Sequence, residues 1–295
     1  MSEVRIDALL PAEMAMRAEY VGVRKSEMPA LTMFSLALLA GAFIALGAVF
    51  ANTVSAGTIT VAASDGSVAF TTGLPYGVVR VLAGLVFCLG LILVVVGGAE
   101  LFTGNNLIVM AWAGGKVTTR ALLRNWIIVY LGNFVGAIST ALLVFLSGQH
   151  TFGKGAVGLV ALSTAAAKTS LGFGQAIALG ILCNALVCLA VWMTFSARST
   201  LDKIAVIIFP ITAFVTAGFE HSVANMYFIP YGLLIKMFDP AYTAQFAGKI
   251  ANLQNLTWGN FFIHNLIPVT LGNIIGGAVL VAAVYWSIFL RNKEA

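Results

Sequence analysis

Glu220 and His221 stand next to each other in the middle of a long apolar stretch between Lys203 and Lys236. Glu100 is the other acid placed in this way, in an earlier apolar stretch. A charged side chain at the centre of a bilayer costs at least about 2.5 kcal/mol, so such residues are rare and mark pathways for ions or protons. An imidazole is the side chain that changes charge near neutral pH. These residues predict the centre of a pore that conducts an ion or a proton.

The polar residues of these stretches admit a structural and a chemical interpretation. We expect Glu100, Glu220 and Asn225 to brace irregular backbone by hydrogen bonding, because a carboxylate would repel an anion. His221 either fills a polar hole as a neutral ring or responds to an arriving anion, whose charge favours the imidazolium. Thr103 adds a hydroxyl donor in the first stretch. The predicted chemistry is therefore that of a proton or anion switch.

The composition is that of a membrane protein. Of 295 residues, 60% are hydrophobic and 9% are charged, whereas about one quarter of a soluble domain is charged. The formal charge of +5 is dispersed along the chain and does not indicate nucleic-acid binding. The sequence has no nucleotide-binding loop, no metal-ligand spacing and no nucleophile motif. We expect no enzyme activity, no cofactor and no metal.

Six apolar stretches are each long enough to cross a bilayer, which takes about 20 helical residues. They lie near Leu31–Asn52, Val78–Trp112, Ala121–Ser147, Phe173–Ser196, Ile204–Met237 and Phe261–Leu290. The second and fifth are too long for one straight crossing, and polar residues interrupt them at Glu100–Asn106 and Glu220–Asn225. Irregular backbone survives at membrane depth only inside protein or beside water. We therefore predict broken second and fifth spans.

The distribution of basic residues predicts the orientation. Six spans place both termini on one side, which carries eleven Lys and Arg residues against five on the other side. Basic residues are enriched on the cytoplasmic side, so both termini are expected in the cytoplasm. We expect a multi-pass protein of a bacterial cytoplasmic (inner) membrane, in contact with lipid.

The chain divides into three predicted regions. Residues 1–30 form a cytoplasmic N-terminal segment, residues 31–290 form the six-span channel domain, and residues 291–295 form a cytoplasmic C-terminus. Ile6–Arg24 is amphipathic. Such a helix lies on the membrane surface or plugs the cytoplasmic mouth, and the sequence leaves both interpretations open.

The two halves of the sequence echo each other. The matching segments, in the same order, are 41–47 with 174–180, 100–105 with 220–225, and 132–136 with 272–276. Each half holds three spans, an odd number, so the second half must be inverted in the membrane. Inverted repeats place a transport site near the midplane, between broken helices. The predicted fold is an all-α six-span bundle with inverted three-span repeats.

Three motifs carry a resemblance to a known family. They are Gly98-Ala-Glu-Leu-Phe-Thr-Gly104, Gly218-Phe-Glu-His-Ser-Val-Ala-Asn-Met226 and Asn265-Leu-Ile-Pro-Val-Thr-Leu-Gly-Asn-Ile-Ile-Gly-Gly277. With them the chain resembles the formate/nitrite transporter family along nearly its whole length. The resemblance implies an aquaporin-like protomer, a homopentamer with one pore in each protomer, and transport of small monovalent anions.

The resemblance also implies roles for individual residues. His221 resembles the family's central pore histidine, and Thr103 resembles its partner in the first break. Asn184 resembles a pore-lining asparagine, and Lys168 resembles a vestibule lysine. The hydrophobic constrictions would be formed by Phe87, Leu91, Leu101 and Phe214. Ordinary core packing is the alternative for these four apolar residues.

Three motifs bear on the identity of the substrate. Phe195-Ser-Ala-Arg-Ser-Thr-Leu-Asp-Lys203 and Tyr285-Trp-Ser-Ile-Phe-Leu-Arg291 resemble the formate branch, whereas Glu100-Leu-Phe-Thr-Gly104 is closer to nitrite members. We predict a pH-dependent channel or transporter for formate, with nitrite and then hydrosulfide as alternatives and protons as a second partner. A neutral-solute channel of aquaporin type is the alternative from another class, and it would need no titratable residue at its centre.

Overall fold

The long apolar stretches of the sequence form helices, because a helix satisfies its own backbone groups where lipid offers no hydrogen-bond partner. The computed structural model describes residues 8–57, 59–62 and 68–291. Within these ranges, six helices are long and apolar enough to cross a membrane: α2 (Ala30–Ser55), α3 (Tyr76–Gly97), α5 (Thr119–Leu146), α7 (Phe173–Thr194), α8 (Thr200–Ala217) and the continuous run Trp258–Phe289. The prediction of six apolar spans is confirmed.

The last span changes its helical geometry along its length. It begins as α11 (Trp258–Asn260) and continues through α12 (Ile267–Ile274) to α13 (Val284–Phe289). π-helical turns at Phe261–Leu266 and Ile275–Ala283 join these pieces. The shorter helices of the described chain are α1 (Pro11–Ser26), α4 (Val109–Ala113), α6 (Ala156–Lys168), α9 (Ser222–Phe238) and α10 (Pro240–Phe246). The C-terminal region predicted at 291–295 lies, apart from Arg291, outside the described residues.

A β-hairpin between α2 and α3 departs from the all-α prediction. Strands β1 (Ile59–Ala62) and β2 (Val68–Thr72) pair antiparallel, with Ile59 opposite Thr72 and Val61 opposite Phe70. β-branched and aromatic residues are frequent in both segments, and such residues favour extended backbone. The hairpin is the only sheet in the described part of the chain, and it leaves the helical bundle unchanged.

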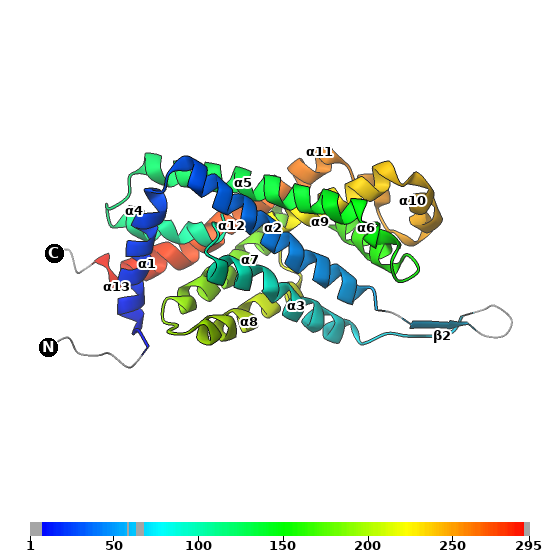
Figure 1. Cartoon of the computed structure of the whole chain (residues 1–295), viewed down its shortest axis with the longest axis horizontal. Helices are drawn as coiled ribbons and strands as arrows, with labels where there is room; N and C mark the ends of the chain where they lie inside the picture. Colours follow the sequence, from blue (N-terminus) through cyan, green and yellow to red (C-terminus); the bar gives the residue numbers. More distant parts are fainter. Residues whose placement is uncertain (1–7, 58, 63–67, 292–295) are drawn as a thin grey trace.

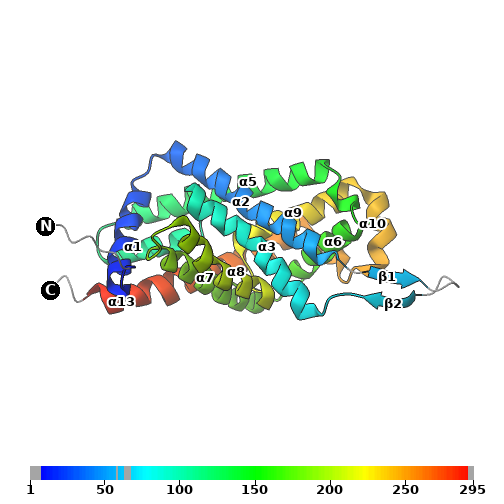
Figure 2. The same cartoon turned by 60° about the horizontal axis from the view of Figure 1, so that its bottom comes forward.

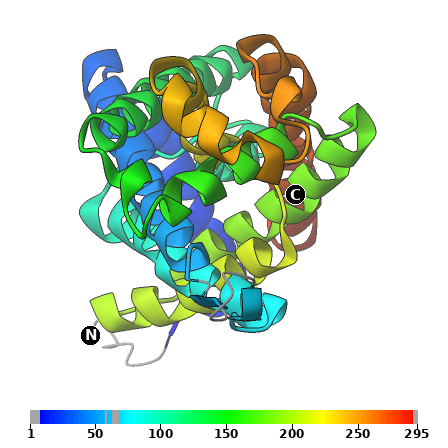
Figure 3. The same ribbon diagram turned by 90° about the vertical axis from the view of Figure 1, so that its right-hand side faces the viewer.

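The long helices run side by side along the longest axis of the molecule (Figures 1 and 2). Helices α1, α4 and α13 lie together at one end, which we call the α1 end. Helices α6 and α10 and the hairpin lie at the opposite end, which we call the α6 end; Figure 3 looks along the bundle from there. The N-terminal and C-terminal helices therefore share one end, as an even number of spans requires.

Helices α3 and α8 each end partway along one of the long apolar stretches of the sequence. Gly98 (φ +79°) follows α3 and Gly218 (φ +76°) follows α8, both in the left-handed region that glycine adopts without steric cost. Residues 98–103 and 218–221 then leave helical geometry before a 3₁₀ turn at Gly104–Ile108 and helix α9. We call these segments the first loop and the second loop.

Glycines allow the helices that carry the loops to approach closely. A Cβ atom on Gly84 of α3 would lie 2.7 Å from the carbonyl oxygen of Thr212 in α8. A Cβ atom on Gly47 of α2 would lie 2.7 Å from the carbonyl oxygen of Phe87 in α3. Small residues at such crossings let apolar helices pack backbone to backbone. The spacing of α2, α3 and α8 therefore depends on hydrogen atoms in place of side chains.

We predict that Gly84→Ala destabilises the folded protein, because the added methyl group must push α3 away from α8. Overpacking of this kind costs about 1–3 kcal/mol. Gly77→Ala is the matched control in the same helix, since nothing lies within 4 Å of its Cβ position. Thermal unfolding of the two variants in detergent measures the difference. Equal melting temperatures for both variants would show that the α3–α8 crossing tolerates a side chain.

Candidate functional site

His221 and Thr103 join the two loops. The Nε2 atom of His221 lies 2.9 Å from the Oγ1 atom of Thr103. Both residues are buried, with 3% of His221 and none of Thr103 exposed. His221 also caps α9, because its Nδ1 atom accepts the backbone N–H of Ala224 at 3.1 Å. The only bond between the loops' side chains in the described structure thus connects a titratable ring to a hydroxyl group.

The cap on α9 determines which histidine nitrogen carries the proton. A nitrogen that accepts the Ala224 N–H cannot hold a hydrogen atom, so the neutral ring of His221 carries its proton on Nε2. Nε2–H then donates to the hydroxyl oxygen of Thr103, whose own hydrogen is free for another acceptor. The pair therefore offers one free donor, the Thr103 hydroxyl hydrogen, while the imidazole of His221 donates to the hydroxyl oxygen.

The amide of Asn133 in α5 secures the first loop. Its Oδ1 atom accepts the backbone N–H of Phe102 at 2.9 Å. Its Nδ2 atom donates to the carbonyl oxygens of Ala37 and Glu100, at 2.7 and 2.9 Å. The N–H of Glu100 donates to the carbonyl oxygen of Leu36 at 3.2 Å. One buried amide therefore satisfies both a donor and an acceptor of the loop and ties the loop to α2.

The amide of Asn273 in α12 secures the second loop in the same way. Its Oδ1 atom accepts the backbone N–H of Ser222 at 2.9 Å. Its Nδ2 atom donates to the carbonyl oxygens of Gly180 and Glu220, both at 2.9 Å. The N–H of Glu220 donates to the carbonyl oxygen of Leu179 at 3.3 Å. Each of the two asparagines therefore satisfies backbone groups at one loop.

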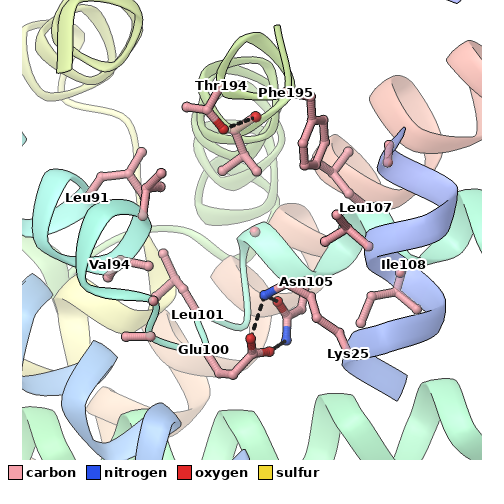
Figure 4. Close-up of a pocket in the computed structure, with 18 residues that line it drawn as sticks. Lys25, Leu91, Val94, Glu100, Leu101, Asn105, Leu107, Ile108, Thr194 and Phe195 are labelled. Carbon is pink, nitrogen blue, oxygen red and sulfur yellow. Dashed lines mark hydrogen bonds and ion pairs between the residues drawn. The ribbon is translucent and has the colours of Figure 1, made fainter. Parts of the chain in front are cut away.

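The Glu100 carboxylate is held by two side chains, one from α1 and one from the 3₁₀ turn that follows the first loop (Figure 4). It accepts from the Nζ atom of Lys25 in α1 and from the Nδ2 atom of Asn105, both at 2.7 Å. Asn105 also donates to the Oδ1 atom of Asn125, whose Nδ2 atom donates to the carbonyl oxygen of Lys25. This closed cluster fastens α1 to the first loop.

The Glu220 carboxylate has the corresponding partners. It accepts from the Nζ atom of Lys168 and the Nδ2 atom of Asn225 at 2.7 Å, and from the Nδ2 atom of Asn265 at 3.1 Å. Asn225 also donates to the Oδ1 atom of Asn265, whose Nδ2 atom donates to the carbonyl oxygen of Lys168. The cluster fastens α6 to the second loop, as the first cluster fastens α1.

These bonds correct the expected manner of bracing. The partners of Glu100 and Glu220 in the described structure are lysine and asparagine side chains, not backbone N–H groups. The backbone is satisfied by amides instead, because an amide offers a donor and an acceptor together whereas a carboxylate only accepts. Lys25 was not singled out from the sequence as a loop partner. Its signal was the correspondence of Lys25-Ser26 with Lys168-Thr169 in the repeat.

A cavity of about 250 Å³ lies between the first loop and α1. Leu91 and Leu101 line it beside Lys25 and Glu100. Figure 4 shows the two leucines on the opposite side of this cavity from Ile108 and α1. Two of the four predicted constriction residues therefore line the cavity next to α1.

A second cavity, of about 280 Å³, lies on the side of the α6 end. Phe87, Phe214 and His221 line it together with Lys168 and Glu220. The rings of Phe87 and Phe214 meet edge to face at 5.7 Å, and the ring of Phe214 stacks on that of His221 at 5.9 Å. The other two predicted constriction residues therefore line this cavity, and one of them contacts the histidine.

Asn184 lies behind the Thr103–His221 pair. It is fully buried and donates to the carbonyl oxygens of Asn273 and Thr103, at 2.7 and 3.3 Å. It lines neither of the two cavities. The structure thus brings Asn184 to the same centre, where it holds backbone beside Thr103.

The buried cysteines form no further reactive centre in the described structure. Cys88, Cys183 and Cys188 are free thiols inside the bundle. Within the described residues, no three side chains of His, Cys, Asp or Glu gather as metal ligands. The chemistry of the site therefore rests on the imidazole, the hydroxyl group and the two lysine–carboxylate pairs.

Comparison with known proteins gives consistent matches. The family model described as "Formate/nitrite transporter" matches residues 12–287. The chain is 45% identical over 289 residues to the formate channel FocA of Escherichia coli (strain K12), covering 98% of this chain and 97% of that protein. A solved structure described as "Pentameric formate channel with formate bound" is 45% identical, with a TM-score of 0.77, covering 89% of this chain and 98% of that one. A solved "FNT family ion channel" is 26% identical, with a TM-score of 0.76, covering 94% of this chain and 98% of that one.

We predict that Asn273→Ala reduces the amount of folded protein in membranes. The change removes the partner of the Ser222 N–H and of the Glu220 carbonyl oxygen, and each unpaired buried polar group costs about 1–3 kcal/mol. Asn133→Ala should act similarly. Gln149→Ala, which removes one exposed bond to Thr53, is the control. Normal yields and melting temperatures for both asparagine variants would remove the bracing role from these amides.

Proposed function

Because the chain belongs to the formate/nitrite transporter family, we propose that it conducts formate across a membrane as a homopentamer with one pore in each protomer. The relative from Escherichia coli (strain K12) is named a formate channel, and the similar solved structure is pentameric and holds formate. Both match nearly the whole chain. These matches also place the chain among transport proteins rather than enzymes.

The observation that carries the proposal is the position of the Thr103–His221 pair. The pair lies where two loops meet, with a cavity on the α1 side and another on the α6 side. In each cavity a lysine–carboxylate pair stands beside two apolar constriction residues. A small anion would thus pass from one cavity to the other by way of this pair.

The proposed architecture is an aquaporin-like inverted repeat with broken second and fifth spans. The matching hydrogen bonds of Asn133 and Asn273, and of Glu100 and Glu220, support it. In this arrangement residues 1–30 form an N-terminal segment, residues 31–290 form the channel domain and residues 291–295 form the C-terminus. The loops would then lie near the midplane, where protein instead of lipid satisfies their backbone.

In the proposed passage, hydrogen bonds from the protein replace the water molecules that solvate the anion. An anion in either cavity would lie beside the vestibule lysine, Lys168 or Lys25, and would cross an apolar constriction that excludes water. At the centre it would accept the free hydroxyl hydrogen of Thr103. Proton sharing with His221 would lower the cost of carrying charge through this dry position, since a neutral acid needs less solvation than its anion.

The cap on α9 adds a condition to this proton sharing. A second proton on His221 must reside on Nδ1, which is occupied by the Ala224 N–H. Protonation would therefore break the N-cap hydrogen bond of α9, and the Ala224 N–H would need another acceptor. The proposed pH dependence thus couples the charge of the ring to the geometry of the second loop.

The proposed orientation places the α1 end in the cytoplasm of a bacterial cell, in the cytoplasmic membrane. The excess of basic residues on that side supports it. Helix α1 packs on α4 and lines the cavity next to Lys25, which supports a role for this segment at the cytoplasmic mouth. Nitrite remains a second candidate substrate, because Glu100-Leu-Phe-Thr-Gly104 resembles the nitrite members of the family.

We predict that His221→Asn removes the pH dependence of formate flux while the protein still folds. An asparagine oxygen can accept the Ala224 N–H, because asparagine is a preferred N-cap residue, but it does not titrate near neutral pH. Formate uptake into proteoliposomes across a pH series measures the effect. His221→Phe should instead block flux, since it adds an apolar ring without a cap. A wild-type pH profile in His221→Asn would show that the histidine has only a structural role and does not share a proton with the anion.

We predict that Phe214→Ala and Leu91→Ala loosen the selectivity among formate, nitrite and hydrosulfide without loss of assembly. Each change widens an apolar constriction and removes no binding group. Parallel uptake assays with the three anions measure selectivity, and native mass spectrometry checks the pentamer. Unchanged ratios of the three rates in both variants would assign these side chains to ordinary packing.

A further inference from the structure

The cavity at the α6 end is lined by two cationic side chains, Lys168 and Arg80. The Nζ atom of Lys168 lies 2.7 Å from a carboxylate oxygen of Glu220, so its charge is balanced locally. Arg80, in the second turn of α3, donates to the carbonyl oxygens of Val215 and Thr216 at the end of α8. No described carboxylate forms an ion pair with Arg80. Arg80 is therefore the uncompensated cation of this cavity.

The cavity at the α1 end lacks such a residue. Its charged lining residues are Lys25 and Glu100, which pair at 2.7 Å. Residue 200, which occupies the position of Arg80 in the second half of the repeat, is a threonine. The two cavities thus differ by one positive charge, although each holds a lysine–carboxylate pair at 2.7 Å.

The bonds that Arg80 makes leave it able to attract an anion. A guanidinium group has five N–H donors, and the carbonyl groups of α8 engage only its Nε and Nη2 atoms. The negative end of the α8 dipole offsets at most about half of one charge. A Cβ atom on Gly218 would lie 3.6 Å from Nη2, so the group sits at the start of the second loop. Asn52, buried in the same lining, has an Nδ2 atom without a partner among the described residues.

We propose that Arg80 draws small monovalent anions into the cavity at the α6 end, ahead of the constriction formed by Phe87 and Phe214. The inference rests on the proposed function and adds to it the residue that supplies the electrostatic attraction. A cleft with low-dielectric walls focuses the field of a single charge and raises the local concentration of the opposite ion. Lys168, neutralised by Glu220, contributes less to this attraction than its position suggests.

The experiment compares Arg80→Gln and Arg80→Lys in proteoliposomes. Formate uptake is measured well below saturation while the ionic strength is raised with sodium gluconate. We expect Arg80→Gln to lower the rate about threefold to tenfold at low ionic strength and to flatten its salt dependence, because one partly screened charge is lost. Arg80→Lys should retain most of the rate and the salt dependence, since it keeps the charge. Lys249→Gln removes an exposed charge outside the cavity and should behave as the wild type.

The outcomes separate attraction from a structural role at α8. If Arg80→Lys is as slow as Arg80→Gln and both keep the wild-type salt dependence, Arg80 only holds the end of α8 and the inference is overturned. A wild-type rate that does not fall with ionic strength overturns it as well, even if Arg80→Gln fails to assemble. A wild type that carries no formate at any pH counts against the proposed function itself, which is a separate result.

Discussion

The backbone N–H and C=O groups of the two loops lie inside an apolar bundle, so protein groups must hydrogen-bond them. The arrangement of the other residues at the site depends on which groups do so. Asn133 and Asn273 do it with one amide each. Asn133 accepts a loop N–H and Asn273 accepts the N–H of Ser222, which directly follows its loop, and each donates to a loop carbonyl oxygen. Because the amides satisfy the backbone, the carboxylates of Glu100 and Glu220 are available to pair with lysines. Those pairs tie α1 and α6 to the loops, and the fixed loops bring Thr103 and His221 within hydrogen-bond distance.

The two polar residues at the centre of the proposed pore lie at positions where the two halves of the sequence differ. With Glu100 aligned on Glu220, His221 corresponds to Leu101 and Thr103 corresponds to Val223. The repeated residues are those that hold the loops, and the unmatched residues are those that face each other across them. Arg80 is a second unmatched residue, one that changes the charge of a cavity without altering its framework. In the proposed repeat, the scaffold can therefore support a site with different groups on its two sides, because the bracing bonds do not involve the residues that differ.

The spans and the positions of the two loops follow from sequence patterns with a direct physical meaning. Apolar length gives the six helices, and an acid with an asparagine five residues later marks each loop. The partners of those acids could not be derived in this way, because Lys25 and Glu100 are separated by 75 residues and meet only through the packing of α1. The hairpin was missed because short extended segments between spans carry a weak pattern. The histidine tautomer likewise depends on the cap of α9, which only the folded loop reveals.

The proposal that Thr103 and His221 act as one unit at the centre of the pore is tested most directly by a double-mutant cycle. Formate uptake would be measured at one pH for the wild type, Thr103→Val, His221→Asn and the double variant. Thr103→Val removes one neutral hydrogen bond, worth about 0.5–1.5 kcal/mol, which corresponds to roughly a twofold to tenfold loss of rate. If the two residues act through their shared bond, the threonine change costs less once the histidine is gone, and the loss in the double variant is smaller than the product of the two single losses. A double variant whose loss equals the product of the two single losses would show that the residues act independently, and the paired centre would be contradicted.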